Sequence, residues 1–318
     1  MGASLSTMAR RVRRTLTGAM TENSENSENT ANIQDGSTPD APRETGGPAT
    51  APVTLVIGGT GKTGRRVAAR LTARGLPVRI GSRGALPRFD WEDPSSWEAV
   101  LEGVGAVYLT YYPDLAFPGA AEAVEAFSAL AVARGARRLV LLSGRGEEGA
   151  LAAEERMKAT GADWTVVRAS WFAQNFSEGF FLESVLAGEI VLPTGSAVEP
   201  FVDAEDIADV VVAALTDQRH VGRTYEVSGP RLLSFHDVAA ALSAATGRPV
   251  GYAPVGKEEY RAGLVADGLP PEFADLFDLI TDGRNAHLAS GVQEALGRAP
   301  RDFAEYARKT AAAGAWDL

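Results

Sequence analysis

The chain has 318 residues, of which 45% are hydrophobic, which is enough to build one large core or two smaller ones. A net charge of -10 with only four lysines excludes a surface built to bind nucleic-acid phosphates through clustered cationic side chains. The absence of cysteine excludes disulfides and thiolate metal sites, and no run reaches the roughly 20 apolar residues of a membrane span. We therefore expect a soluble protein of the cytoplasm. We expect no metal site, because the three histidines do not stand at metal-ligand spacing from one another.

Residues 1–50 differ in composition from the rest of the chain and are expected to form a disordered leader. The stretch 21–50 has almost no large apolar side chains to bury. Before it, apolar residues recur at roughly helical spacing beside the arginines of MARRVRR, which fits a basic amphipathic helix at a membrane surface. The same sequence also fits a weakly structured leader, or residues that precede a true translation start at Met8 or Met20. The first six residues, MGASLS, also match the short myristoylation pattern.

From Thr54 onward, short apolar runs alternate with helical patterns. In chain order the predicted elements are strand TLVIG, helix RRVAARLTARG, strand PVRIG, helix SSWEAVLEG, strand AVYLT, helix GAAEAVEAFSALAVARG, strand RRLVLLS, helix LAAEERMKATG and strand DWTVVRA. Ser95 or Ser96 is the expected N-cap of the second helix. Such alternation predicts an α/β fold, with a doubly wound parallel sheet of the Rossmann type covered on both faces.

After Ser170 the alternation loosens. The stretches 172–189 and 204–217 have helical patterns, TYEVSG is typical of a strand, and a helix is predicted from an N-cap at Ser234. From Val255 the pattern is mostly helical. Because no second polar linker appears, we expect one domain over 51–318. Its dinucleotide-binding core would cover about 51–170, and a smaller, mostly helical capping region would build the substrate side from about 171–200 and 228–318.

The stretch VIGGTGKTGRRV contains the Gly-Lys-Thr with which a triphosphate-binding loop ends. That loop needs its first glycine five residues before Gly61, and the residue there is Val56, inside a predicted strand. Gly58, Gly61 and Gly64 instead give the spacing of a dinucleotide loop, and they stand where a strand ends and a helix begins. Helix N-terminal amides would then face a pyrophosphate. The sequence therefore predicts dinucleotide binding.

The end of the second predicted strand, RIGSRG, indicates which dinucleotide is preferred. An acid at this place accepts from a ribose 2′-hydroxyl, whereas a basic group favours a 2′-phosphate. No carboxylate stands between Gly58 and Asp90, while Arg79, Ser82 and Arg83 are available. Arg83 with Ser82 would clamp the phosphate, although Arg83 is also compatible with an ordinary solvated loop residue. The expected cofactor is NADP(H) in preference to NAD(H).

Five segments carry a resemblance to a known family. GGTGKTGRRV, FDWEDPSSWEAVLEGV, VLLSGRGEEG, DWTVVRASWFAQNFSEG and PFVDAEDIADVV together resemble the NmrA-like branch of the atypical short-chain dehydrogenase/reductases. The similarity runs from about Val53 to the C-terminus, and Trp-Phe-x-Gln-Asn-Phe is its most specific part. Within the branch the chain looks most like the ergot-alkaloid clavine reductases and their bacterial relatives.

The resemblance implies which residues contact the cofactor. It places Ser82 and Arg83 at the adenosine phosphate, Asp90 and Trp91 at the adenine, and Asn175 with Tyr111 at the nicotinamide end. The implied cofactor-binding residues are Gly58, Thr60, Gly61, Lys62, Thr63, Gly64, Ser82, Arg83, Asp90, Trp91, Thr110, Ser143 and Phe172. Ligands at the carboxyl ends of parallel strands agree with this placement. Plain core packing remains an equal alternative for the aromatic side chains at Trp171, Phe172 and Phe176.

The sequence departs from the family's catalytic pattern. Catalytic short-chain enzymes use a Tyr-xxx-Lys pair, and none of the seven tyrosines here has a lysine four residues later. The corresponding helix carries Glu154, Glu155 and Lys158, and Ser143 lacks its usual tyrosine partner. An ordinary surface ion pair between Glu154 and Lys158 is the favoured interpretation of their spacing. The candidate catalytic residues are Tyr111, Glu154, Lys158 and Asn175.

Two functions fit these observations. An NADPH-dependent oxidoreductase without the tyrosine acid would reduce an iminium, a quinone or a related conjugated compound rather than a simple ketone, a reaction that suits secondary metabolism. Tyr111, Tyr112, Trp171 and Phe172 would form aromatic walls, and a C-terminal set would close over the small-molecule substrate: Tyr260, Leu264, Phe273, Leu276, Phe277 and Leu279. The alternative is a redox-sensing regulator that binds NADP(H) without turnover. Either protein would be a monomer or a homodimer.

Overall fold

The computed structural model describes residues 52–266 and 268–318. The leader expected at 1–50, with its amphipathic-helix and myristoylation hypotheses, lies outside these residues. None of the helices in the described part of the chain combines the length and the apolar character needed to cross a membrane.

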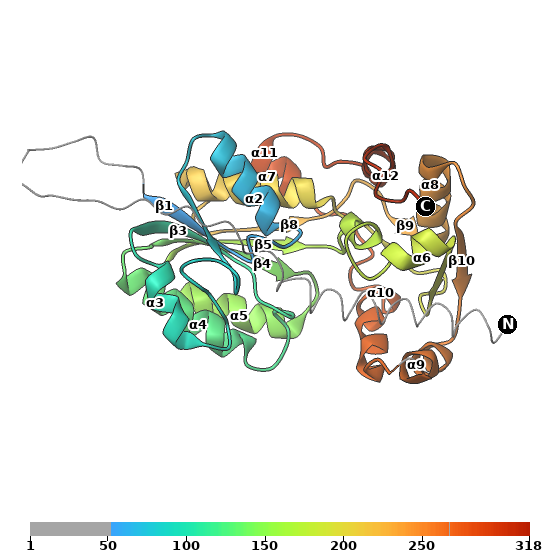
Figure 1. The fold of residues 1–318 in the computed structure, drawn as a ribbon, viewed down its shortest axis with the longest axis horizontal. Helices are drawn as coiled ribbons and strands as arrows, with labels where there is room; N and C mark the ends of the chain where they lie inside the picture. Colours follow the sequence, from blue (N-terminus) through green and yellow to red (C-terminus); the bar gives the residue numbers. More distant parts are fainter. Residues whose placement is uncertain (1–51, 267) are drawn as a thin grey trace, which may run out of the picture.

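The larger part of the fold is built on a six-stranded parallel sheet, which confirms the predicted Rossmann-type class (Figure 1). The strand order is β2-β1-β3-β4-β5-β8, so the chain reverses its winding direction between β1 and β3, where open sheets of this kind bind ligands. The strands are β1 (Val53–Ile57), β2 (Val78–Gly81), β3 (Val104–Leu109), β4 (Arg138–Gly144), β5 (Asp163–Ala169) and β8 (Arg223–Val227).

Helices cover both faces of the sheet (Figure 1). One face carries α2 (Gly64–Ala73), α7 (Ala204–Thr216) and α11 (Gly291–Leu296), and the other carries α3 (Trp97–Val100), α4 (Ala120–Ala133) and α5 (Glu148–Ala159). Successive strand residues point to opposite faces. Leu55 accordingly joins the core under α4 and α5, while its neighbour Val56 joins the core under α2 and α7. This two-sided burial explains why the strands are continuous apolar runs in the sequence.

The start of the helical segment before β3 differs in part from the prediction. Ser96 stands at the N-cap position of α3, as predicted, but it makes no side-chain capping bond. The Asp93 side chain accepts from the backbone N–H of Ser95 and begins a 3₁₀ turn, η1 (Pro94–Ser96), ahead of that helix. The Ser96 hydroxyl instead donates to the Asp93 carbonyl oxygen at 2.6 Å. An aspartate followed by proline at the first helical position is a strong start signal, and here it begins the turn before α3.

The smaller region lies beyond the carboxyl ends of the strands (Figure 1). It contains α6 (Leu182–Ala187), α8 (Phe235–Thr246), α9 (Lys257–Ala266), α10 (Asp278–Thr281) and α12 (Phe303–Ala312). Their apolar faces meet in a third core that includes Phe176, Phe201 and Phe235. The predicted N-cap at Ser234 is confirmed, since its hydroxyl oxygen accepts from the backbone N–H of Asp237 in a capping box.

Two predictions for this region were incomplete. The stretch 172–189 is not one helix, because a 3₁₀ turn, η2 (Ala173–Phe176), precedes the short α6. Two small sheets were also not predicted. They pair β6 (Glu189–Leu192) with β10 (Gly251–Pro254) and β7 (Val198–Glu199) with β9 (Leu233–Ser234).

Candidate functional site

The glycine loop after β1 forms a cradle that side chains would fill. Gly58 has a left-handed φ of 65°, and a Cβ there would overlap the hydroxyl of Thr110. A Cβ at Gly64 would overlap the carbonyl oxygen of Gly58, because the start of α2 packs directly on the loop. The Gly61 N–H donates to the same oxygen at 2.9 Å. The predicted tight turn and close helix packing are therefore both present.

The N-terminus of α2 is suited to an anion. Its N-cap residue, Thr63, makes no side-chain capping bond, so the first amides of the helix are not satisfied by that side chain. The buried Thr63 hydroxyl oxygen instead accepts from the Tyr108 hydroxyl at 2.9 Å. Thr60 is exposed at the tip of the loop. A cradle of glycine backbone before an open helix N-terminus fits a pyrophosphate.

Two of the three candidate residues for the cofactor's 2′-phosphate remain available at the carboxyl end of β2. Arg79 is held elsewhere, because its guanidinium donates to the carbonyl oxygens of Val100 and Glu102. Ser82 is partly buried and Arg83 is exposed, with the guanidinium carbon 5.9 Å from the ring centroid of Tyr112.

The predicted adenine residues lie beside the end of β3. The Trp91 indole N–H donates to the carbonyl oxygen of Thr110 at 3.0 Å, and its ring lies 5.0 Å from that of Tyr111. The Asp90 carboxylate accepts from Arg88 at 2.5 Å. The structure thus brings Trp91, Thr110 and Tyr111 together, while Asp90 is engaged by a neighbour on its own loop.

A cavity of about 420 Å³ lies where β3, β4 and β5 end. Six of the predicted residues line it: Lys62, Thr110, Tyr111, Ser143, Phe172 and Asn175. The predicted C-terminal closing set also lines it in full: Tyr260, Leu264, Phe273, Leu276, Phe277 and Leu279. Side chains from distant parts of the sequence therefore enclose one largely apolar space, and its volume is in the range of small-molecule sites, about 300–1,000 Å³.

The aromatic side chains divide between the cavity and the core. Trp171 and Phe172 line the cavity, and the Trp171 ring stacks on Phe181 with a centroid separation of 6.1 Å. Phe176 is fully buried in the third core, so plain packing is correct for that residue. The prediction for Tyr112 was wrong, because it lies outside the cavity lining and is 60% exposed.

The predicted ion pair between Glu154 and Lys158 is present, but it does not lie at the surface. Glu154 is fully buried, and its carboxylate accepts from the Ser143 hydroxyl at 2.7 Å and from Arg168. Lys158 lies 3.6 Å from Glu154, but its ammonium is closer to Glu155, at 2.8 Å. The buried face of α5 packs against the sheet, where a guanidinium from β5 compensates the charge. Neither Glu154 nor Lys158 belongs to the cavity lining.

Comparison with known proteins places this geometry in a family. A sequence model described as NAD(P)H-binding matches residues 58–218, and the model of the NmrA-like family matches residues 151–307. The NAD(P)H azoreductase of Xenophilus azovorans is 32% identical, over 81% of this chain and 98% of its own. The agroclavine dehydrogenase of Claviceps fusiformis is also 32% identical, over 79% of this chain and 95% of its own. The chain belongs to the NmrA-like family of NAD(P)H-binding proteins.

Solved structures share the fold of this NmrA-like chain. The NADPH-dependent quinone oxidoreductase QOR2 of Escherichia coli, in complex with NADPH, has a TM-score of 0.65 at 19% identity, over 81% of this chain and 99% of its own. NmrA, described as a negative transcriptional regulator and solved with NAD, has a TM-score of 0.63 at 18% identity, over 85% of this chain and 100% of its own. The same fold thus occurs in a reductase and in a regulator.

Three charged residues near the cavity were missed from the sequence. Glu147 and Asp114 line the cavity. Burial together with the charge of Asp114 raises the pKa of Glu147 to about 7. Arg145 also lines it and is itself buried, with Nη1 donating to the Ser170 hydroxyl at 2.8 Å. Their position directly after β3 and β4 was the available signal, since ligands bind at such strand ends.

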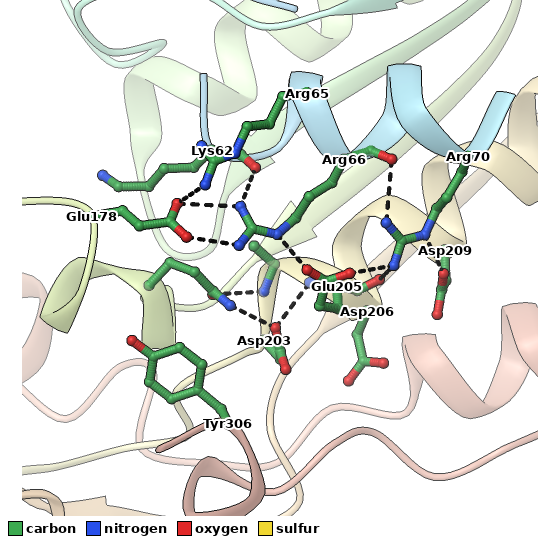
Figure 2. A network of polar contacts seen from close by, with 12 residues as sticks. Lys62, Arg65, Arg66, Arg70, Glu178, Asp203, Glu205, Asp206, Asp209 and Tyr306 are labelled. Atoms are coloured by element: carbon green, nitrogen blue, oxygen red, sulfur yellow. Dashed lines mark hydrogen bonds and ion pairs between the residues drawn. The ribbon is translucent and has the colours of Figure 1, made fainter. Parts of the chain in front are cut away.

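A charged network joins the glycine-loop helix to the rest of the NmrA-like site (Figure 2). Arg65 and Arg66 from α2 both donate to Glu178, which follows η2, and Arg66 also donates to Glu205 on α7 at 2.6 Å. Burial by itself would raise the pKa of Glu178, but the hydrogen bonds from Arg66 and Arg65 outweigh it and lower the pKa. Burial lowers the pKa of Lys62, against the opposing charge of Glu178.

Proposed function

We propose that this NmrA-like protein is an NADPH-dependent reductase that transfers hydride to a small conjugated acceptor such as an iminium, a quinone or an azo compound. The observation that carries the proposal is the apolar cavity of about 420 Å³ at the carboxyl ends of β3, β4 and β5. Aromatic side chains such as Trp171 and Phe172 line it, and such walls suit a flat acceptor.

The preference for NADP(H) over NAD(H) is part of the proposal. It is supported by Arg83 and Ser82 at the end of β2, where the sequence offers no carboxylate to a ribose hydroxyl. The bound cofactor would supply the hydride. The glycine cradle and the α2 N-terminus would hold its pyrophosphate, with Lys62 nearby, and Asp90 and Trp91 would contact its adenine.

The chain's own residues would act mainly by orientation. Tyr111 and Asn175 would contact the acceptor, since both line the cavity. Glu154 would act as a positioning residue through its bond with Ser143, and Lys158 would support it from the same helix. The core at about 51–170 would carry the cofactor, while 171–200 and 228–318 would build the substrate side.

The choice of acceptor follows from the missing Tyr-xxx-Lys pair. Reduction of a simple ketone leaves an alkoxide that needs a strong positioned acid, whereas iminium ions and quinones accept hydride more readily. The two relatives described above, an azoreductase and a dehydrogenase, support a redox role. Similarity to NmrA supports the second candidate, a redox sensor that binds NADP(H) without turnover.

A turnover panel separates these functions. The full chain is incubated with NADPH and, in turn, menadione, N-methyl-3,4-dihydroisoquinolinium and methyl red, and NADPH consumption is followed by absorbance. A reductase consumes NADPH with at least one probe, and Leu279→Ala on the cavity wall raises the KM for that probe. Leu288→Ala, a 52% exposed leucine outside this cavity, is the matched control. Consumption with no probe would favour the sensor.

A further inference from the structure

The carboxylate of Glu147 lines the cavity without taking part in the hydrogen bonds and ion pairs that hold the described fold together. Glu147 stands between β4 and α5, and a Cβ at Gly144 would overlap its carboxylate, so the group lies directly over the end of β4. Within residues 52–266 and 268–318, this carboxylate has no hydrogen-bond or ion-pair partner. Asp114, from the loop after β3, lines the same wall. Glu147 is therefore a partly buried acid that faces the ligand space.

Both tyrosines of the cavity lining are poor proton donors near neutral pH. Burial raises the pKa of Tyr260 to about 12, and burial with the charge of Glu92 raises that of Tyr111. The Arg145 guanidinium is engaged by Ser170 and His287. Burial lowers the pKa of Lys62, but this residue belongs to the loop that would hold the pyrophosphate, and its ammonium lies 5.9 Å from the ring centroid of Phe180.

We propose that Glu147 is the proton donor of the reaction, delivering its carboxyl proton to the acceptor atom that hydride transfer leaves negatively charged. This inference rests on the proposed reductase function. It assigns the acid role that the missing tyrosine leaves open, and it moves that role from α5, where the sequence placed its candidates, to the loop before it.

The step balances with a quinone as acceptor. The quinone gains a hydride, which carries two electrons, from NADPH, which is oxidised to NADP⁺. The negative oxygen that results forms an O–H bond as the O–H bond of Glu147 breaks, and the carboxylate regains its proton from water. An iminium ion needs no such proton, because hydride addition to its carbon leaves a neutral amine.

The surroundings of Glu147 favour its protonated form. Burial is the main cause and the charge of Asp114 the second, and together they raise the pKa of Glu147 to about 7. A general acid works best when its pKa lies near the working pH. The charged and titratable groups that face the same cavity are Lys62, Tyr111, Asp114, Arg145 and Tyr260.

The first test compares Glu147→Gln with Glu148→Gln, a neighbouring exposed glutamate outside the cavity lining. With menadione, Glu147→Gln should lower kcat about a hundredfold or more, which is the range of general acid catalysis. With N-methyl-3,4-dihydroisoquinolinium, the same variant should keep the wild-type rate. Glu148→Gln should match the wild type with both. Equal rates of Glu147→Gln and wild type on menadione would overturn the proposal while leaving the reductase function intact.

The second test uses the pH profile. Menadione reduction by the wild type should fall as pH rises through about 7, and the fall should be absent in Glu147→Gln. Asp114→Asn removes the neighbouring charge, so the midpoint should move to lower pH. This variant keeps the oxygen that accepts from the Ala116 N–H. A midpoint unmoved in Asp114→Asn would contradict the assignment even if Glu147→Gln failed to fold.

A third readout needs no turnover. The full chain is labelled with ¹³C at the glutamate carboxyls and titrated with pH by NMR. One carboxyl resonance whose titration midpoint is about pH 7 should be lost in Glu147→Gln and remain in Glu148→Gln. Because burial also raises the pKa of Glu199 to about 7, Glu199→Gln identifies the second such resonance. If no resonance with this midpoint is lost in Glu147→Gln, the proposal fails. If the wild type reduces no acceptor at all, the proposed function fails with it.

Discussion

The carboxylate of Glu154 and the guanidinium of Arg168 form a two-pronged ion pair between α5 and β5. Arg168 Nε lies 2.8 Å from Oε1, and Nη2 lies 2.7 Å from Oε2. Glu154 is fully buried, and the Ser143 hydroxyl that lines the cavity donates to the same carboxylate. Lys158 lies farther away, at 3.6 Å, so the buried charge depends mainly on the Arg168 guanidinium.

Removing Arg168 should therefore destabilise the protein strongly. Arg168→Met leaves the Glu154 charge buried without its main partner, and the free energy of unfolding should fall by about 3–5 kcal/mol in urea denaturation. The matched control is Arg137→Met, since Arg137 is 59% exposed and lies 3.9 Å from Asp163, and its loss should be below about 1 kcal/mol. The double variant Glu154→Gln/Arg168→Met should recover part of the loss. Similar losses for the two arginine variants would contradict this account.

The glycine cradle should tolerate no side chain at Gly64. Gly64→Ala forces a Cβ against the Gly58 carbonyl oxygen, so stability should fall by about 1–3 kcal/mol and NADPH binding should weaken. Gly256→Ala is the control, because a Cβ there meets nothing within 4 Å and its change should stay within about 0.5 kcal/mol. Thermal unfolding and NADPH fluorescence measure both effects. Unchanged NADPH affinity in Gly64→Ala would remove the loop from the cofactor site.

Arg83 should discriminate between the two cofactors. If its guanidinium holds the 2′-phosphate, Arg83→Ala should weaken NADPH binding by about 10- to 100-fold, the worth of a charged hydrogen bond, and NADH binding little. Arg74→Ala removes another exposed arginine from the same β1-α2-β2 unit and should affect neither cofactor. Calorimetric titration of both cofactors decides the matter, and equal losses for NADPH and NADH would refute the assignment.

Glu199 should make the protein less stable at alkaline pH. Burial raises its pKa to about 7, and its Oε2 has no hydrogen-bond partner in the described part of the chain. A raised pKa means that the stabilisation is complete below the unfolded pKa and is lost as pH rises through about 7. Glu199→Gln should therefore increase the free energy of unfolding above that pH by on the order of 2–3 kcal/mol, with no gain in acid. Parallel pH profiles for the variant and the wild type would contradict this.

Local signals in the sequence were sufficient for the sheet and the glycine loop. The strands are long apolar runs buried on both faces, and the loop needs glycine at fixed spacing, so both leave a pattern. The first helix after β2 was placed correctly, with Ser96 at its N-cap, but the 3₁₀ turn that Asp93 caps ahead of it was missed. The small sheets were missed because strands as short as Val198–Glu199 leave no periodicity.

The residues of the candidate site were predictable only where they follow a strand of the sheet in the sequence. Tyr111 and Asn175 follow strands of the sheet, and the structure brings both to the cavity. Glu154 was interpreted as a surface residue because its spacing to Lys158 is typical of exposed helices, whereas burial against Arg168 depends on tertiary packing. Glu147 was missed for a related reason. Its environment is set by burial and by Asp114, which is more than thirty residues away in the sequence.

Deuterium transfer is the most direct test of the reductase function. The full chain is incubated with NADPH deuterated at nicotinamide C4 and with N-methyl-3,4-dihydroisoquinolinium, and the amine product is analysed by mass spectrometry. The account predicts one deuterium on the carbon next to nitrogen, with consumption of one NADPH for each product formed. The account would be contradicted if the protein bound NADPH but formed no deuterated amine from the iminium and consumed no NADPH with the quinone or azo probes. The redox-sensor function would then remain.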